Sequence, residues 1–489
     1  MWNAPHVRIV TRFPSISLPG LLAATTMGVY LLLVAGAVTS VTDAASACMA
    51  WPACGDGLSL PTTTDGWIAV GHRLAAVVVG IVLLGTTVIA YRRGVERRVA
   101  AALGLALALY PVQAGIGAVV AVAGASASLS AVHLGLGVLI FSSSLAALAW
   151  RLEILTGHRE ESEVGGGVAF GSPSGEDRGA PPAEGGAPTV PERPELPTSG
   201  IARAKLTVRA YYSLMKPRLM WLLCLVAAAA MALAGGPGFT PSVVAATLVG
   251  GALAIGASGT FNHVLERDVD RRMQRTSDRP LATELVPVSN AVAFGIVLAG
   301  VSLALFAWVN LLAAALGLVA ILFYSVIYTL VLKPNTVQNT VIGGAAGALP
   351  ALIGWAAVTG EIGLGGVLLA TLIFAWTPAH FYNLALAYKE DYARGGFPMM
   401  PVVRGETATR RHIVWYLGAT LAVAAALAAW TELGWLFAAT TVGIGAVFLW
   451  AVIRLHFERT ERAAFRAFHA SNAYLGLALL AVLFDATLF

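Results

Sequence analysis

The stretch "FNHVLERDVDRRMQRTSDRPL", residues 261–281, places a dense run of acids and bases directly after a long apolar segment. That segment, near residues 241–264, is long enough to cross a bilayer as a helix. Asn262, Glu266 and Asp270 are spaced by four residues and therefore share one helix face. Oxygen ligands on one face suit Mg²⁺, which takes its other ligands from water and phosphate oxygens. The alternative is a charged membrane-proximal loop whose acids pair with its own arginines.

A second stretch, "WTPAHFYNLALAYKEDYARGGFPMMPVV" (residues 376–403), repeats this arrangement. His380, Asn383 and Asp391 recur on one helix face, again where an apolar segment meets a charged loop. A third charged segment offers Lys333 to the same region. Two acidic clusters with cations beside an apolar scaffold indicate a site for a substrate with a diphosphate head and a hydrocarbon tail.

The composition predicts an all-α polytopic membrane protein. The 489 residues are 57% hydrophobic and only 12% charged, whereas a soluble domain carries about 25% charged residues. No long basic run is present, which argues against nucleic-acid binding. We expect thirteen membrane spans, at about 18–40, 67–91, 99–123, 129–151, 216–235, 241–264, 288–307, 310–332, 339–358, 363–386, 412–431, 433–454 and 467–488.

The charges of the loops predict the orientation. Lys and Arg are concentrated in the loops at one end of the spans, while the opposite loops 41–66, 124–128 and 235–241 contain neither residue. The positive-inside rule then places the N-terminus and both acidic stretches in the cytoplasm and the C-terminus outside the cell membrane.

Residues 157–200 separate four spans from nine. They are rich in Gly, Pro, Glu and Ser and have few aromatic residues, so they cannot bury a core. We therefore expect a four-helix domain at 1–155, a disordered cytoplasmic linker at 156–204 and a nine-helix domain at 205–489.

Residues 262–281 resemble the N-x-x-x-D-x-x-x-D…R-T-x-x-R-P-L motif of the UbiA superfamily of intramembrane prenyltransferases. The segments 216–218, 328–360 and 376–405 are similar to its protohaem IX farnesyltransferase branch, and the resemblance covers 205–489. Glu266 stands where the motif has aspartate, and the second acidic motif is reduced to Asp391.

This resemblance implies transfer of a farnesyl group from farnesyl diphosphate to a vinyl group of haem B, which forms haem O. Mg²⁺ would be held by Asn262, Glu266, Asp270 and Asp391, and the diphosphate by Arg275, Arg279 and Lys333. His380 would bind the haem iron or a propionate; the alternative is a histidine that forms hydrogen bonds between helices.

In the first four spans, His72 and His133 lie near the same membrane side. Two imidazoles across a four-helix bundle can ligate one haem iron axially, or they can be packed side chains. Residues 19–151 resemble one half of haem A synthase, which implies a bound haem and a haem A synthase as a possible partner. Ile68 replaces the glutamate of that family's motif, so we expect no oxidase activity.

Cys48 and Cys54 lie in one polar loop that the orientation places outside. A disulfide is the expected arrangement, and a metal site is the alternative.

Two rival functions fit parts of the sequence. A UbiA-type transferase acting on a quinone or lipid acceptor would keep the acidic motifs. A haem-binding or haem-transport protein would use only the histidines.

Overall fold

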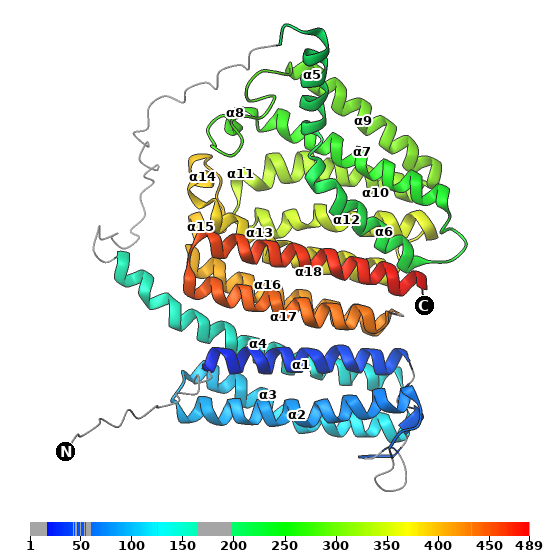
Figure 1. Cartoon of the computed structure of the whole chain (residues 1–489), viewed down its shortest axis with the longest axis vertical. Helices are drawn as coiled ribbons and strands as arrows, with labels where there is room; N and C mark the ends of the chain where they lie inside the picture. The colour runs from blue at the N-terminus through cyan, green and yellow to red at the C-terminus, as the bar shows by residue number, and fades with distance from the viewer. Residues whose placement is uncertain are drawn as a thin grey trace, which may run out of the picture.

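A computed structural model describes residues 17–488 of the chain, apart from residues 43, 45, 49, 53, 55–59, 125, 165–196 and 432. Within this part of the chain, thirteen helices are long and apolar enough to cross a membrane. This confirms the predicted all-α polytopic fold, and Figure 1 shows the long helices lying side by side along one direction. The elements are α1 (Leu18–Val41), η1 (Ser46–Cys48), α2 (Thr64–Arg92), α3 (Arg97–Ala123), α4 (Ala127–Val164), α5 (Gly200–Leu214), α6 (Pro217–Ala234), α7 (Pro241–Leu265), α8 (Arg267–Asp270), α9 (Val288–Val309), α10 (Leu311–Leu322), η2 (Phe323–Leu332), α11 (Lys333–Asn335), α12 (Asn339–Thr359), α13 (Leu364–Ala387), α14 (Lys389–Arg394), α15 (Met400–Val403), α16 (Glu406–Trp430), α17 (Trp435–Glu458) and α18 (Glu461–Leu488).

Polar side chains fix where several spans begin. Within a bilayer, backbone N–H groups that lack a helical partner must be satisfied internally, and a capping oxygen satisfies one of them. Ser17, Thr63, Thr240 and Asn310 accept hydrogen bonds from the backbone N–H three residues later, at the starts of α1, α2, α7 and α10. These caps set the boundaries that hydropathy alone leaves open by a few residues.

The first four spans form a bundle in which α1 contacts α2 and α4, and α3 contacts α2 and α4. Figure 1 shows this blue and cyan group on one side of the molecule. At the end of α1, Cys48 and Cys54 form a disulfide with Cα atoms 4.4 Å apart. The Arg73 guanidinium holds this loop by donating to the carbonyls of Cys48 at 2.7 Å and Ala50 at 2.8 Å.

Among the remaining nine spans, α12 and α13 contact each other and together contact α6, α7, α10, α16 and α18. One of them, residues 311–335, changes from an α-helix into the π-helix η2 before the three residues of α11. A π-helical stretch is rare and occurs mainly at functional sites. Figure 1 shows α8, α11, α14 and α15 gathered at the end of this group opposite the C-terminus.

The two groups of spans share one hydrophobic core, because α1 and α4 lie against α16 and α17. The Trp150 and Trp415 rings meet edge to face with centroids 6.2 Å apart. Arg411 forms an ion pair with Glu153, and Arg459 donates to the Thr156 carbonyl. The linker is therefore not the only connection between the groups.

The expected disordered linker at 156–204 is too long at both ends. Helix α4 continues to Val164, and α5 already begins at Gly200; residues 165–196 lie outside the described residues. The composition of the whole segment is dominated by its Gly- and Pro-rich centre. Its first residues, "GHREESEV" (157–164), include arginine and three glutamates, which are good helix formers and extend α4.

Candidate active site

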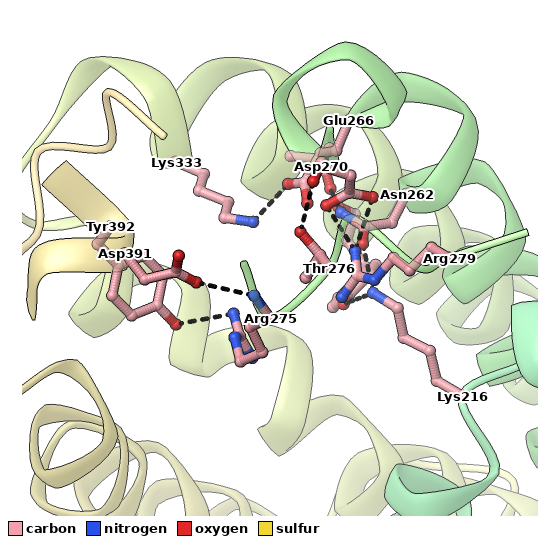
Figure 2. Close-up of polar contacts among 12 residues, drawn as sticks. Lys216, Asn262, Glu266, Asp270, Arg275, Thr276, Arg279, Lys333, Asp391 and Tyr392 are labelled. Carbon is pink, nitrogen blue, oxygen red and sulfur yellow. Dashed lines mark hydrogen bonds and ion pairs between the residues drawn. The ribbon is translucent and has the colours of Figure 1, made fainter. Parts of the chain in front are cut away.

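The acidic site forms where α7 ends. A continuous helix was expected from Asn262 to Asp270, but α7 stops at Leu265 and the four-residue α8 follows. The break lies at Glu266, whose backbone is non-helical with φ −96° and ψ 4°. The three side chains still gather at one place (Figure 2), and Asn262, Glu266 and Asp270 are only 2%, 5% and 3% exposed.

Each of the two carboxylates is paired with a cation, Glu266 with one from another segment and Asp270 with one from its own loop. Lys333 Nζ lies 2.6 Å from Glu266 Oε1. Arg279 Nη1 donates to both carboxylate oxygens of Asp270 at 2.8 Å. Both cations are residues that the family motif predicts for the diphosphate. The alternative, that this loop's acids pair with its own arginines, holds for Asp270 and Arg279 but not for Glu266.

Lys216 is the site residue that sequence reasoning missed. Its Nζ donates to Asn262 Oδ1 and, at 3.1 Å, to the Tyr324 hydroxyl. Asn262 Nδ2 donates to Thr329 Oγ1 at 3.1 Å, which turns the amide oxygen toward Lys216. Tyr324 and Thr329 both belong to η2. The signal was the "KPR" of residues 216–218, where a lysine directly precedes a span.

The balance of charge changes the pKa values at this site. Burial alone would raise the pKa of the Glu266 carboxyl, but the charges of Lys333 and Lys216 outweigh it and lower that pKa. Burial, followed by the charge of Arg279, lowers the pKa of Lys216 to about 8. The positive charge of Lys216 is therefore held at an energetic cost, which an incoming anion would relieve.

Asp391 lies apart from Asn262, Glu266 and Asp270. Its carboxylate accepts from the backbone N–H of Gln274 at 2.8 Å and of Arg275 at 3.4 Å, and Arg394 pairs with it at 2.9 Å. Figure 2 shows it on the opposite side of the site from Asp270. Asp391 therefore connects the loop after α8 to α14. Among the described residues, no three His, Cys, Asp or Glu side chains form a metal-binding group.

The Arg275 guanidinium lies over two aromatic rings of the same region. Its guanidinium carbon lies 5.1 Å from the centroid of Tyr388 and 5.5 Å from that of Tyr392, and Nη2 donates to the Tyr392 hydroxyl at 3.4 Å. Cation–π contacts of this kind hold an arginine in place without neutralising its charge. Arg275 thus keeps a positive charge facing the site, opposite Asp270 (Figure 2).

An apolar cavity runs from this site into the membrane interior. Lys216, Tyr324, Ser258 and Gly259 lie at its polar end. The rest of its lining comes from α6, α7, α9, α10 and α12 and is almost entirely apolar: Leu219, Leu223, Ala227, Ala254, Ile255 and Ile353 are typical members. Such a cavity takes a hydrocarbon chain whose polar head remains among the cations.

His380 is accounted for by packing. Its ring is stacked between Trp376 and Phe468, with centroid distances of 4.2 Å and 4.5 Å. Its Nδ1 forms a 2.7 Å hydrogen bond with Ser471 Oγ on α18. The structure therefore favours the alternative reading, a histidine that links two helices.

His72 and His133 lie in the N-terminal bundle, apart from the acidic site. A Cβ added at Gly36 would lie 3.4 Å from His72 Cε1, and one at Gly117 would lie 3.0 Å from His133 Cε1. His133 Nε2 lies 3.3 Å from Gln113 Nε2. The Nδ1 atoms of both rings are buried and have no partner among the described residues.

Residues 222–476 match the UbiA prenyltransferase family. The chain is similar to "Protoheme IX farnesyltransferase 1" of Natronomonas pharaonis, with 61% identity over 466 residues that cover 95% of this chain and 98% of that protein. It is 59% identical to "Protoheme IX farnesyltransferase" of Haloquadratum walsbyi over 468 residues, 95% of each chain. "Protoheme IX farnesyltransferase 1" of Saccharopolyspora erythraea is 43% identical over 296 residues, 60% of this chain and 92% of that protein. A solved UbiA homolog from Archaeoglobus fulgidus bound to DMAPP and Mg²⁺ has 17% identity and a TM-score of 0.42, covering 56% of this chain and 98% of that chain.

The first two relatives extend over the N-terminal spans as well, because their alignments cover 95% of this chain. Their names describe one transferase, so these matches give no support to a fused haem A synthase. The family match covers more than half of the chain, and two relatives reach about 60% identity along nearly all of it. The chain belongs to the UbiA prenyltransferase family.

Proposed function

We propose that this chain transfers the farnesyl group of farnesyl diphosphate to a vinyl group of protohaem IX and so forms haem O. The observation that carries this proposal is the joining of two buried carboxylates, three cations and an apolar cavity at one membrane boundary. The acceptor follows from the relatives of about 60% identity, whose names specify protohaem IX.

The residues present fit a Mg²⁺–diphosphate pair. Asn262, Glu266 and Asp270 place amide and carboxylate oxygens together, the donor set that Mg²⁺ prefers. They would hold the ion, which as a Lewis acid stabilises charge on the leaving diphosphate. Asp391 has its oxygens on the backbone of the neighbouring loop, so we assign it the positioning of that loop and of Arg275.

The cations and the cavity have separate tasks in the transfer. Lys216, Lys333 and Arg279 neutralise diphosphate oxygens as the allylic C–O bond breaks. Arg275, held by its two tyrosines, adds charge from the opposite side. The apolar lining keeps water from the allylic cation until the vinyl group attacks it. Water then adds to the haem side chain and completes the hydroxyethylfarnesyl group.

Purified protein supplied with haem B, farnesyl diphosphate and Mg²⁺ is expected to produce haem O, identified by its mass. Chelation of Mg²⁺ should lower the rate by about 10²-fold or more, because the leaving group loses its Lewis acid. Alkylation of a quinone or lipid acceptor with no haem product would favour the first rival function. Haem binding with no prenylated product from any acceptor would favour the transport function.

We further propose that residues 1–155 form a domain that binds a haem between His72 and His133, separate from the transferase domain at 205–489. The unpartnered Nδ1 atoms of both rings support a bound ligand. The relative from Saccharopolyspora erythraea supports the division, since 296 matched residues make up 92% of it.

Purified protein is expected to show a six-coordinate, low-spin haem spectrum that His72→Ala and His133→Ala each abolish. Both variants should still form haem O at the wild-type rate, because the acidic site lies in the other domain. An unchanged spectrum in both variants would return the two histidines to a packing role. Loss of haem O formation with normal membrane insertion would contradict a haem site that acts independently of the acidic site.

We also propose that the acidic site faces the cytoplasm and that the C-terminus lies outside. The basic residues of the loops support this orientation. A C-terminal tag accessible only from the cytoplasmic side would overturn it.

A further inference from the structure

Phe306 lines the apolar cavity in its outer part, at the level of Gly250 on α7. It lies on α9, three residues before the end of that helix, and it is 0% exposed. Its ring fills the space beside two glycines on different helices. A Cβ added at Gly250 of α7 would lie 3.2 Å from the ring, and one at Gly317 of α10 would lie 2.5 Å from it. The ring is therefore clamped between α7 and α10.

The backbone around Phe306 is fixed as well. One turn earlier on α9, Ser302 Oγ donates to the Gly250 carbonyl at 2.7 Å. This bond joins α9 to α7 at the glycine that the ring contacts. Phe306 also belongs to a buried cluster with Ala254 and Ile353, both of which line the cavity. The ring thus has little freedom to move aside for a longer ligand.

The depth of the cavity matches three isoprene units. Its α7 lining begins at Gly259 near the cations. The nine residues of helix from there to Gly250, the glycine that the Phe306 ring contacts, span about 14 Å. An extended chain advances about 1.2 Å per bond, so the twelve-carbon backbone of a farnesyl group is about 13 Å long. A fourth isoprene unit adds four bonds and brings the length to about 18 Å, which exceeds this depth.

We propose that Phe306 limits the prenyl donor to fifteen carbons. This inference rests on the proposed transfer from a prenyl diphosphate and adds the length of the chain that the site accepts. Removing the ring opens the space between Gly250 and Gly317, into which the last isoprene unit of a geranylgeranyl group extends.

A substitution at Gly251 allows the opposite test, in which the cavity is made shorter. It lines the cavity, and a Cβ added there meets no atom within 4 Å. A larger side chain at this position therefore occupies the cavity and not the surrounding core. Gly251→Leu should shorten the space to two isoprene units while leaving Phe306 in place.

The test compares geranyl, farnesyl and geranylgeranyl diphosphate as donors to haem B, with the product lengths read by mass. Wild type should favour farnesyl over geranylgeranyl by about 10²-fold in kcat/KM, and Phe306→Ala should reduce this ratio by about 10- to 200-fold. Gly251→Leu should shift the preference to geranyl. Phe448→Ala removes an equally buried ring from α17, outside the cavity, and should keep the wild-type ratio.

Three results would overturn the inference. The first is a wild-type enzyme whose kcat/KM for geranylgeranyl diphosphate equals that for farnesyl diphosphate. The second is a Phe306→Ala enzyme with an unchanged ratio. The third is a Gly251→Leu enzyme with the donor preference of wild type. This variant also provides the test if Phe306→Ala fails to insert in the membrane. If no donor of any length alkylates haem in wild type, the proposed transfer itself fails, and this outcome is distinct from the other three.

Discussion

Asp270→Ala is expected to reduce haem O formation by about 10³-fold or more while the protein still inserts in the membrane. The Asp270 carboxylate is 3% exposed and holds Arg279 through both of its oxygens. Its loss removes an oxygen from the proposed Mg²⁺-binding set and releases Arg279, the arginine proposed to bind the diphosphate. Removing one preorganised electrostatic group costs about 10²- to 10³-fold in rate, and here two groups are affected together.

Asp268→Ala is the matched control for this substitution. Asp268 lies in the same four-residue helix α8, but its side chain is 68% exposed and pairs with Arg267 and Arg271. An exposed ion pair of this kind contributes little, so haem O formation should remain close to wild type. Rates are compared at equal amounts of membrane-inserted protein. Wild-type activity in Asp270→Ala, or an equal loss in Asp268→Ala, would refute the assignment of Asp270 to the site.

The spans and the acidic site were predictable because each rests on a local signal. Hydropathy over about twenty residues defines a span, and this signal recovered all thirteen. The four-residue spacing of Asn262, Glu266 and Asp270 predicted that these side chains gather at one place, and they do so even though α7 ends at Leu265. The break does not disperse them, because Lys333 and Arg279 draw the two carboxylates toward one point.

What the sequence did not reveal depends on contacts between distant segments. Asp391 has the same local setting as Asp270, an acid following an apolar helix, yet it accepts from backbone amides of Gln274 and Arg275, more than one hundred residues earlier. The packing of α1 and α4 on α16 and α17 is equally invisible in a composition that separates the two groups by a Gly- and Pro-rich segment. Phe306 looks like any aromatic residue in a span until Gly250 and Gly317 are seen on either side of its ring.

Lys216 was overlooked because a lysine before a span is the usual positive-inside feature. Its backbone conformation indicates a role beyond the orientation of the span. Lys216 has φ 53° and ψ 58°, in the left-handed region, immediately before Pro217. This conformation costs a residue with a Cβ about 1–2 kcal/mol, and glycine would avoid that cost. A lysine at such a position is explained by its side chain, which reaches Asn262 and Tyr324.

Lys216→Met is therefore expected to lower kcat/KM for farnesyl diphosphate by about 10²- to 10³-fold. The unbranched apolar side chain of methionine is one atom shorter and fills most of the same space, but it cannot neutralise a diphosphate oxygen. Lys205→Met, which removes an exposed lysine from α5 eleven residues earlier, is the control and should leave kcat/KM unchanged. Equal effects of the two substitutions would show that only the net positive charge of this region matters.

The pH dependence gives a second test of the same residue. Burial lowers the pKa of Lys216 to about 8, and the pH profile of kcat/KM reports groups of the free enzyme. The ammonium is charged below this pKa, so kcat/KM should be highest below pH 8 and should fall as the pH rises through it. In Lys216→Arg the guanidinium stays charged to a pH above about 12, so the alkaline fall near pH 8 should disappear, although the different shape of arginine lowers the maximal rate. A Lys216→Arg enzyme that keeps the fall near pH 8 would assign that titration to another group and remove Lys216 from the diphosphate site.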